Sequence, residues 1–305
     1  MKLNFKLSLI VIIIVVVIVL AVAIVLLQRS SSLTIGLNTD ALEYIGDGQA
    51  DYWAQRQMGR LNRLDAVSDI FADYKYIEAE NRRAQFDSML EATLDANVDM
   101  ISVYTVWKPN VLDGMDSRYV GAVGSGPAGQ FALAYTRENG IKEKRATTNF
   151  DGTMAYLNGP QAANDYAETP FVRNVQGKDA LLLRLMSPIQ DPETNETIGA
   201  VSCLVDIAAI QAGVEQVMQK NPIIAAMSIY DNTGLIMGSY VPERVGKMLM
   251  DVDAIYGEHA QTVQQAIERG EPLSLSSYSP VLGSNVQIYL TSFHRGCKEQ
   301  FRGNA

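Results

Sequence analysis

The first 30 residues are dominated by one apolar run. From Leu7 to Leu27 the chain contains a single polar residue, Ser8. A helix rises about 1.5 Å per residue, so this run spans roughly 30 Å, the thickness of the hydrocarbon core of a bilayer. In hydrocarbon a helix satisfies its own backbone hydrogen bonds, so the Val- and Ile-rich composition does not favour a strand. Residues 7–27 are therefore predicted to form a transmembrane helix.

Basic residues flank this span unequally. Lys2 and Lys6 precede it, whereas Arg29 alone follows it closely. The positive-inside bias predicts that residues 1–6 lie in the cytoplasm and that the chain after Arg29 is exported. A cleaved signal peptide is the alternative, although its apolar core would normally cover about 7–15 residues. Both interpretations place the remainder in the periplasm or outside the cell, and the first anchors it to the inner (plasma) membrane by a single pass.

The pattern of residues 30–97 predicts helix. Apolar residues recur at three- and four-residue steps between Leu42 and Tyr74, and again from Phe86 to Val98. Glycines cost helix stability, so a bend is expected near Gly46–Gly48. Such apolar stripes are typical of core packing. A long helix leaving a membrane also suits a stalk that packs against a second copy, so a homodimer through this stalk is expected.

From residue 100 onward the pattern changes to strands separated by turns. Short β-branched and aromatic runs predict strands at 100–107, 131–135, 171–175, 179–189, 198–205, 224–230, 235–239, 273–278 and 286–293. A turn is expected at Asn139-Gly140. Helical patterns cover part of 148–163, 207–219 and 254–268. The order of elements repeats in shortened form after Asn221-Pro222, so two α+β lobes are predicted, at about 73–209 and 219–293.

Composition narrows the classes of function. The formal net charge is −9 and the pI about 4.8, without a basic stripe, so nucleic-acid binding is not expected. Cys203 and Cys297 are the two cysteines, and His259 and His294 the two histidines. These residues supply neither a disulfide framework nor a thiolate or histidine metal site. No constellation of nucleophile, base and metal ligands is evident, so we expect no cofactor, no metal and no catalytic activity.

A series of short motifs follows in a fixed order along the chain. The motifs are Val103–Asp116, Gly129–Tyr135, Glu168–Phe171, Ser187–Ile189, Ile198–Val201 with Asp206, Ile229–Gly234 and Val245–Lys247. In order and spacing they resemble the double Cache sensor domains of bacterial methyl-accepting chemotaxis proteins, over roughly residues 35–293. The resemblance implies an α+β ectodomain at 30–293, with a long stalk helix and two stacked PAS-like antiparallel-sheet lobes. It also implies a small-molecule ligand in the lobe distal to the membrane, residues 73–209.

One segment departs from the amino-acid-binding members of that family. Those members carry an Arg and a Trp just before a Tyr, and the Arg holds the ligand carboxylate in a bidentate contact. Here Tyr156 matches, but Thr153 and Ala155 stand at the Arg and Trp positions. Asp206, which pairs with the amino group of the ligand in such members, is present. A cationic or an uncharged ligand is therefore left open.

Six residues are candidate ligand contacts, five of them aromatic. They are Tyr104, Trp107, Tyr135, Tyr156, Tyr166 and Asp206. Amphipathic aromatic side chains line small-molecule sites, although each of these also suits a core. Asp206 ends a buried apolar strand, where it either caps the helix that begins at Ile207 or faces a ligand. Asp113 and Asp116 lack the other ligands of a calcium loop, so a solvated turn is expected there.

The last residues do not fit a receptor of this kind. Such receptors continue into a second membrane helix and a cytoplasmic signalling domain, whereas residues 294–305 are basic and lack periodicity. We expect an atypical tail from a truncated or frame-shifted reading frame, unable to signal by itself. The predicted function is the ligand-sensing region of a chemotaxis transducer. The alternatives are the ectodomain of a sensor histidine kinase or diguanylate cyclase, or an exported membrane-anchored enzyme.

Overall fold

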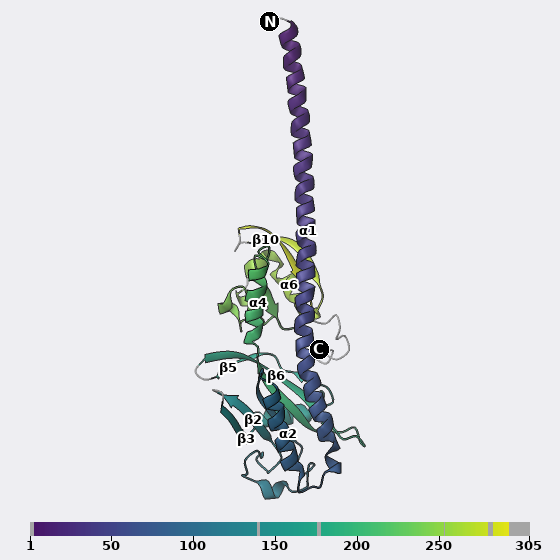
Figure 1. The fold of residues 1–305 in the computed structure, drawn as a ribbon, viewed down its shortest axis with the longest axis vertical. Coiled ribbons are helices and arrows are strands. Elements are labelled where there is room, and N and C mark those ends of the chain that lie inside the picture. Colours follow the sequence, from purple (N-terminus) through teal and green to yellow (C-terminus); the bar gives the residue numbers. More distant parts are fainter. Residues whose placement is uncertain (1–2, 139–140, 176–177, 253, 280–282, 293–305) are drawn as a thin grey trace.

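One long helix projects from a body with two stacked parts (Figure 1). The computed structural model describes residues 3–138, 141–175, 178–252, 254–279 and 283–292. The predicted turn at Asn139-Gly140 and the predicted tail at 294–305 lie outside these residues. The helix α1 (Leu3–Ala72) includes residues 7–27. Across the described part of the chain, no helix is both long enough and apolar enough to cross a membrane, so the predicted transmembrane helix is not confirmed.

The predicted bend near Gly46–Gly48 is wrong, because α1 runs through both glycines without a break. Gly46 has a packing role instead. A Cβ atom at this position would lie 2.9 Å from Cδ1 of Tyr289, so the missing side chain lets the helix approach a strand near the end of the chain. A Cβ atom at Gly48 would meet no atom within 4 Å. The cost of glycine in a helix is thus offset by a close contact at Gly46 only.

The lower part of the body is a seven-stranded antiparallel sheet preceded by two helical segments. Its strands lie in the order β3-β2-β1-β7-β6-β4, and β5 also pairs with β6. The elements are η1 (Asp73–Tyr76), α2 (Arg82–Ala96), β1 (Met100–Trp107), η2 (Asp116–Tyr119), β2 (Leu133–Glu138), β3 (Ile141–Ala146), α3 (Phe150–Leu157), β4 (Tyr166–Ala167), β5 (Phe171–Val175), β6 (Lys178–Gln190) and β7 (Thr197–Asp206). The predicted α+β class with a long N-terminal helix and an antiparallel sheet is confirmed.

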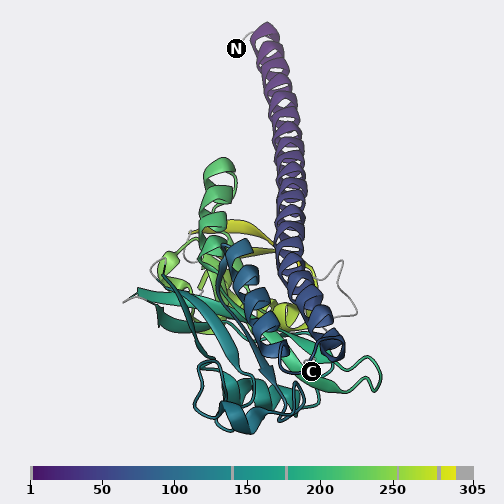
Figure 2. The same cartoon turned by 60° about the horizontal axis from the view of Figure 1, so that its bottom comes forward.

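Helices cover the two faces of this sheet unequally. The end of α1 packs against β6 and β7, and α2 packs against β1 and β2, so both lie on one face (Figure 2). Their core includes Phe71, Phe86 and Trp107, whose rings stack on one another and are fully buried. The short helix α3 covers the other face through contacts with β7 and β1. Because side chains alternate along a strand, each central strand contributes to both cores.

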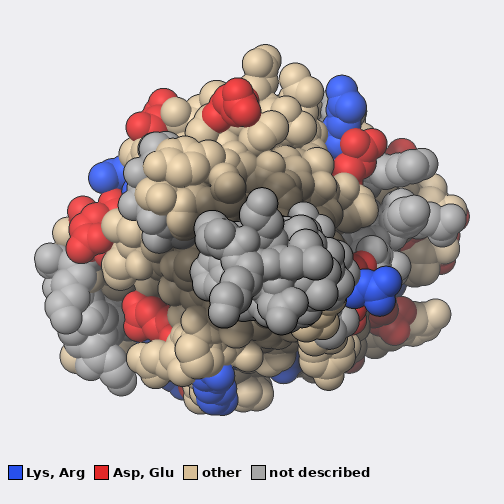
Figure 3. All heavy atoms as spheres, turned by 90° about the horizontal axis from the view of Figure 1, so that it is seen from above, with Lys and Arg blue, Asp and Glu red and all other residues tan. Residues whose placement is uncertain are grey.

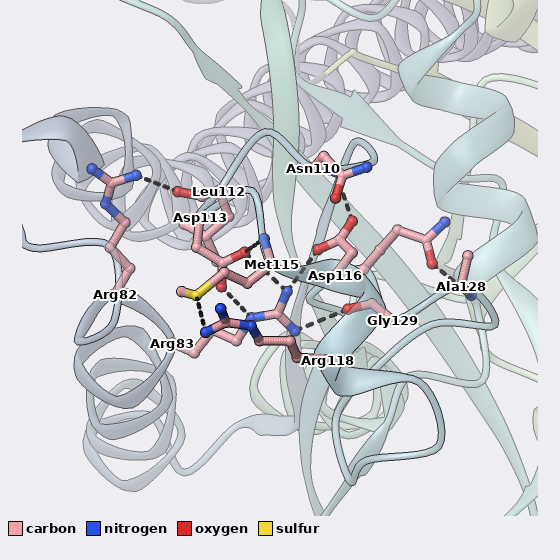
Figure 4. A network of polar contacts seen from close by, with 11 residues as sticks. Arg82, Arg83, Asn110, Leu112, Asp113, Met115, Asp116, Arg118, Ala128 and Gly129 are labelled. Carbon is pink, nitrogen blue, oxygen red and sulfur yellow. Dashed lines mark hydrogen bonds and ion pairs between the residues drawn. The ribbon is translucent and has the colours of Figure 1, made fainter.

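Asp113 and Asp116 do not form the predicted solvated turn. Both carboxylates are buried and pair with Arg83 of α2, at 2.6 Å from Nε to Asp113 Oδ2 and 2.6 Å from Nη2 to Asp116 Oδ1 (Figure 4). Arg83 also donates from Nη1 to the carbonyl oxygen of Gly129 at 2.9 Å. One buried guanidinium thus ties the long connection between β1 and β2 to α2.

The upper part of the body contains two separate antiparallel hairpins. β8 (Ser228–Tyr230) pairs with β9 (Ile236–Ser239), and β10 (Leu273–Ser279) pairs with β11 (Ser284–Leu290). Its helices are α4 (Ala208–Lys220), η3 (Pro242–Arg244), α5 (Leu249–Val252), η4 (Ala254–His259) and α6 (Ala260–Arg269). α4 packs on β9, while α1 contacts β11. Both α1 and the connection through α4 therefore link the hairpins to the seven-stranded sheet.

Candidate functional site

A small pocket opens on the face of the seven-stranded sheet that α3 partly covers. Its volume is about 30 Å³, which leaves space for water-sized groups. Alternate positions on neighbouring strands form its floor, namely Ser102 and Tyr104 on β1, Ala134 and Thr136 on β2, and Arg184 on β6. Because these positions have the same parity on their strands, their side chains converge on one face. We call this cavity the distal pocket.

Tyr104 is the predicted site residue that lines the distal pocket. Its hydroxyl accepts a hydrogen bond from Asn149 Nδ2 at 3.1 Å, just before α3 begins. Burial raises the pKa of the Tyr104 phenol, and the positive charge of Arg184 acts in the opposite direction. Thr153, at the position where the resemblance places an Arg, is fully buried and donates to the carbonyl oxygen of Asn149 at 2.9 Å. The neutral phenol and the amide form a polar cluster between sheet and helix.

Arg184 is the charged group that the sequence-based prediction missed. It is the single Arg within the apolar strand β6, and 14% of its side chain is exposed. Nη1 donates to the carboxylate of Glu168, and the guanidinium carbon lies 5.0 Å from the centre of the Phe171 ring. Its Nε is buried and has no hydrogen-bond partner among the described residues. A lone Arg inside an apolar strand was the sequence signal for this residue.

Tyr156 and Tyr166 lie beside the same face of the sheet. Their ring centres are 5.9 Å apart, and both pack into the core that includes Tyr104. The hydroxyl of Tyr156 donates to the carbonyl oxygen of Asn164 at 2.7 Å. Burial, with a smaller effect from the nearby Asp165 carboxylate, raises the pKa of Tyr156. These two residues therefore share a core with Tyr104, but they do not line the distal pocket.

Trp107 and Tyr135 belong to the opposite face of the sheet. Trp107 stacks on Phe86 within the core beneath α1 and α2. Tyr135 donates from its hydroxyl to Asp87 Oδ1 on α2 at 2.5 Å. The structure thus places these two predicted contacts on the face of the sheet opposite to Tyr104.

Asp206 has a local role at the start of α4. Its Oδ1 accepts the backbone N–H of Ala208, the first residue of that helix, at 2.7 Å. Ile207 is the N-cap residue of α4, so Asp206 lies one residue before it and satisfies the first backbone donor of the helix. The carboxylate is not among the residues that line the distal pocket.

A second, larger cavity of about 1,100 Å³ lies in the upper part of the body. It is bordered by α1 from residues 38 to 53, by the chain from 223 to 232 and by β11. The hydroxyls of Tyr230 and Tyr256, which both line it, lie 2.8 Å apart. We call this 1,100 Å³ cavity the proximal cavity.

The face of the molecule seen from the side on which α1 projects carries acidic and basic side chains interspersed among uncharged ones (Figure 3).

The described residues were also compared with the requirements of a metal-binding or thiol-based site. Within the described residues, no group of three or more His, Cys, Asp or Glu side chains is arranged to hold a metal ion. Cys203 is completely buried, and burial raises the pKa of its thiol to about 12. A buried, protonated thiol is a packing residue, because the thiolate is the reactive form.

Comparisons with known proteins point to one type of domain. No family model matches the chain. A curated relative, the methyl-accepting chemotaxis protein TlpQ of Pseudomonas aeruginosa, is 23% identical over 217 residues, which cover 66% of this chain. The match spans 30% of the length of that protein.

Two solved structures share the fold. The extracellular domain of the putative histidine kinase mmHK1S-Z2 superposes with a TM-score of 0.68 at 19% identity, covering 82% of this chain and 90% of that one. The ligand-binding domain of the Pseudomonas aeruginosa PAO1 amino-acid chemoreceptor PctC, in complex with GABA, gives a TM-score of 0.52 at 14% identity, covering 81% and 89%. The chain therefore has the fold of the extracellular sensory domains of chemoreceptors and histidine kinases, the fold that the double Cache resemblance predicted.

Proposed function

We propose that this chain is the extracytoplasmic sensing region of a membrane-bound chemotaxis transducer and that it binds a small molecule in the distal pocket. The sensory-domain fold supports the first part. The convergence of Tyr104, Asn149 and Arg184 on one face of the sheet supports the second. A binding role agrees with a site that offers hydrogen-bond donors and a charge, as ligand pockets do. We propose no catalytic activity.

The same fold serves two kinds of output. The likeness to the histidine kinase ectodomain supports a sensor kinase as the second candidate. The sequence match to a chemotaxis protein favours the first. In either case the membrane anchor at residues 7–27 and a dimer through α1 remain part of the proposal. A dimeric stalk would let a ligand favour one of two helix packings, which is how such a domain transmits its state.

The distal pocket must widen to hold a whole ligand, because its present volume fits only water-sized groups. The proximal cavity is larger, but it lies between two hairpins that do not pair with each other in the described structure. We favour the distal pocket because charged and neutral donors converge there around a buried floor. Convergent polar groups, rather than volume, give a pocket its specificity.

The experiment combines a ligand screen with two matched variants. Purified full-length chain is screened for small molecules that raise its melting temperature. The exposed rim of each cavity is then filled by one Trp, with Thr148→Trp at the distal pocket and Ala225→Trp at the proximal cavity. Loss of the ligand-induced shift in Thr148→Trp alone supports the proposal. Loss in Ala225→Trp alone would place the ligand in the proximal cavity and contradict it.

A further inference from the structure

Arginines are the charged residues on the lining of the distal pocket, and two of them have partners outside that lining: Arg184 pairs with Glu168, and Arg145 lies 3.6 Å from Glu143. Three arginines from three strands line the pocket: Arg145 on β3, Arg173 on β5 and Arg184 on β6. Neither Asp nor Glu occurs among its described lining residues. The chain as a whole carries a formal charge of −9, so a concentration of arginines at one small pocket runs against its overall composition. A cavity lined by charges of one sign attracts the opposite sign.

One hydrogen-bond donor of Arg184, its Nε, has no partner in the described structure. Glu168 occupies Nη1, and the Phe171 ring lies against the guanidinium. Nε is buried without a hydrogen-bond partner in the described structure. A buried donor without a hydrogen-bond partner lowers the stability of the fold, and the cost is larger when the donor belongs to a charged group. A ligand that supplies an acceptor to Nε would therefore form a strong, charge-assisted hydrogen bond. Arginine binds carboxylates through two parallel N–H donors, and the edge that carries Nε is the one that Glu168 leaves open.

The neutral groups around Arg184 suit an acceptor as well. Asn149 donates to the Tyr104 hydroxyl, which also lies within hydrogen-bond reach of the Ser202 and Thr153 hydroxyls. Burial holds that phenol in its neutral, donating form. Thr147 adds a hydroxyl group on the lining, whereas the Thr136 hydroxyl is already hydrogen-bonded to Ser102 Oγ at 3.2 Å. A planar carboxylate, with four lone-pair positions, satisfies several such donors at once.

We propose that the distal pocket takes a small carboxylate, which Arg184 binds through Nε while Arg145 and Arg173 supply the surrounding positive charge. This inference rests on the proposed function and specifies its ligand class. It differs from recognition by an Arg on the helical segment, because that position is occupied by the buried Thr153. It also replaces an amine held by Asp206, because that carboxylate lies at the start of α4.

The test uses probes of matched size and opposite charge. Butyrate and succinate are compared with butylamine and 1,4-diaminobutane by calorimetry and melting temperature on the full-length chain. We expect binding of at least one carboxylate and of neither amine. Arg184→Gln should weaken the bound carboxylate by about 10- to 100-fold, since a charge-assisted hydrogen bond is lost. Arg184→Lys keeps the charge without the paired donors and should fall between the two.

Two further variants control for the loss of the Glu168 ion pair and for the loss of one positive charge elsewhere. Arg184→Gln leaves Glu168 without its partner, so Arg184→Gln combined with Glu168→Gln restores charge balance and must show the same loss of affinity. Arg63→Gln, on the exposed side of α1, must bind as the unaltered chain does.

If an amine binds, if no carboxylate binds at millimolar concentration, or if Arg184→Gln retains full affinity, the carboxylate inference is wrong. An amine whose binding is abolished by Thr148→Trp would leave the proposed site intact and overturn the ligand class alone. A carboxylate displaced by Ala225→Trp but not by Thr148→Trp would overturn the proposed site itself.

Discussion

Asp165, just before β4, and Asp65 on α1 are neighbouring carboxyl groups, which can share a hydrogen bond when one of the two carries a proton. Burial and then the negative charge of Asp65 raise the pKa of Asp165 to about 7. One oxygen of Asp65, Oδ1, is buried and has no hydrogen-bond partner among the described residues. The pair joins the long helix to the segment that carries Tyr166.

This pair makes stability depend on pH near neutrality. A carboxyl group whose pKa is raised by folding stabilises the fold fully below its unfolded pKa, near 4, and loses that contribution as pH rises toward about 7. The melting temperature should therefore fall between about pH 4 and about pH 7. Asp65→Asn removes the repulsion and should flatten this dependence while raising the melting temperature at pH 8. Asp69→Asn, one turn along and exposed, should leave the slope unchanged. Identical slopes in all three proteins would contradict the coupling.

The buried charges at Arg83 predict a large loss on substitution. Arg83→Met leaves Asp113 and Asp116 buried without their counter-charge, a change that costs about 3–5 kcal/mol in comparable pairs. The free energy of unfolding, measured by urea denaturation, should fall by that amount. Arg118→Met removes an exposed guanidinium in the same loop and should change it by about 0.5 kcal/mol or less. A loss below about 1 kcal/mol in Arg83→Met would mean that the network is not required for the fold.

Much of the fold was predictable because the strongest strands carry their own signal. Residues 100–107 and 198–205 are β-branched and apolar, and they form the neighbouring central strands β1 and β7. The strand β3 was missed for a physical reason. It contains Lys142, Glu143 and Lys144, and it lies at the edge of the sheet, where charged residues are favoured. Its extended form depends on pairing with β2, which no local pattern reveals.

The site was predictable in part. Tyr104 and Trp107 are three residues apart in one strand, and an odd separation puts side chains on opposite faces. Their assignment to a single pocket was therefore in conflict with the predicted strand itself. By the same rule the side chains of Tyr135 and Ala134, which are neighbours in β2, lie on opposite faces of the sheet. Ala134 is the one that lines the distal pocket. Finding Arg184 required knowledge of which face of β6 lies on the same side of the sheet as Tyr104, and that depends on the register of strands distant in sequence.

Gly46 and Gly48, two of the glycines of α1, form a matched pair. Replacing Gly48 by Ala removes the cost of glycine in a helix and should raise the free energy of unfolding by roughly 0.5–1 kcal/mol. The same change at Gly46 brings a methyl group against Tyr289, whose hydroxyl donates to Asp47 Oδ1 at 2.9 Å. Gly46→Ala should therefore be less stable than Gly48→Ala under urea denaturation. Equal gains at both positions would show that α1 and β11 do not pack as closely as the structure places them.

Substitutions of Asp206 distinguish its contact at the start of α4 from a role in ligand binding. Asp206→Ala removes the acceptor of the Ala208 N–H and should lower the free energy of unfolding by about 0.5–1.5 kcal/mol, as the loss of one hydrogen bond does. Asp206→Asn keeps an acceptor oxygen at that position and should recover most of the loss. If Arg184 defines the ligand class, neither change should alter the affinity for a carboxylate, because Asp206 does not line the distal pocket. Calorimetric titration of both variants checks this. An amine ligand that binds the unaltered chain and is lost in Asp206→Asn would instead restore the ligand contact first considered for this residue, since only the charged carboxylate would then account for the binding.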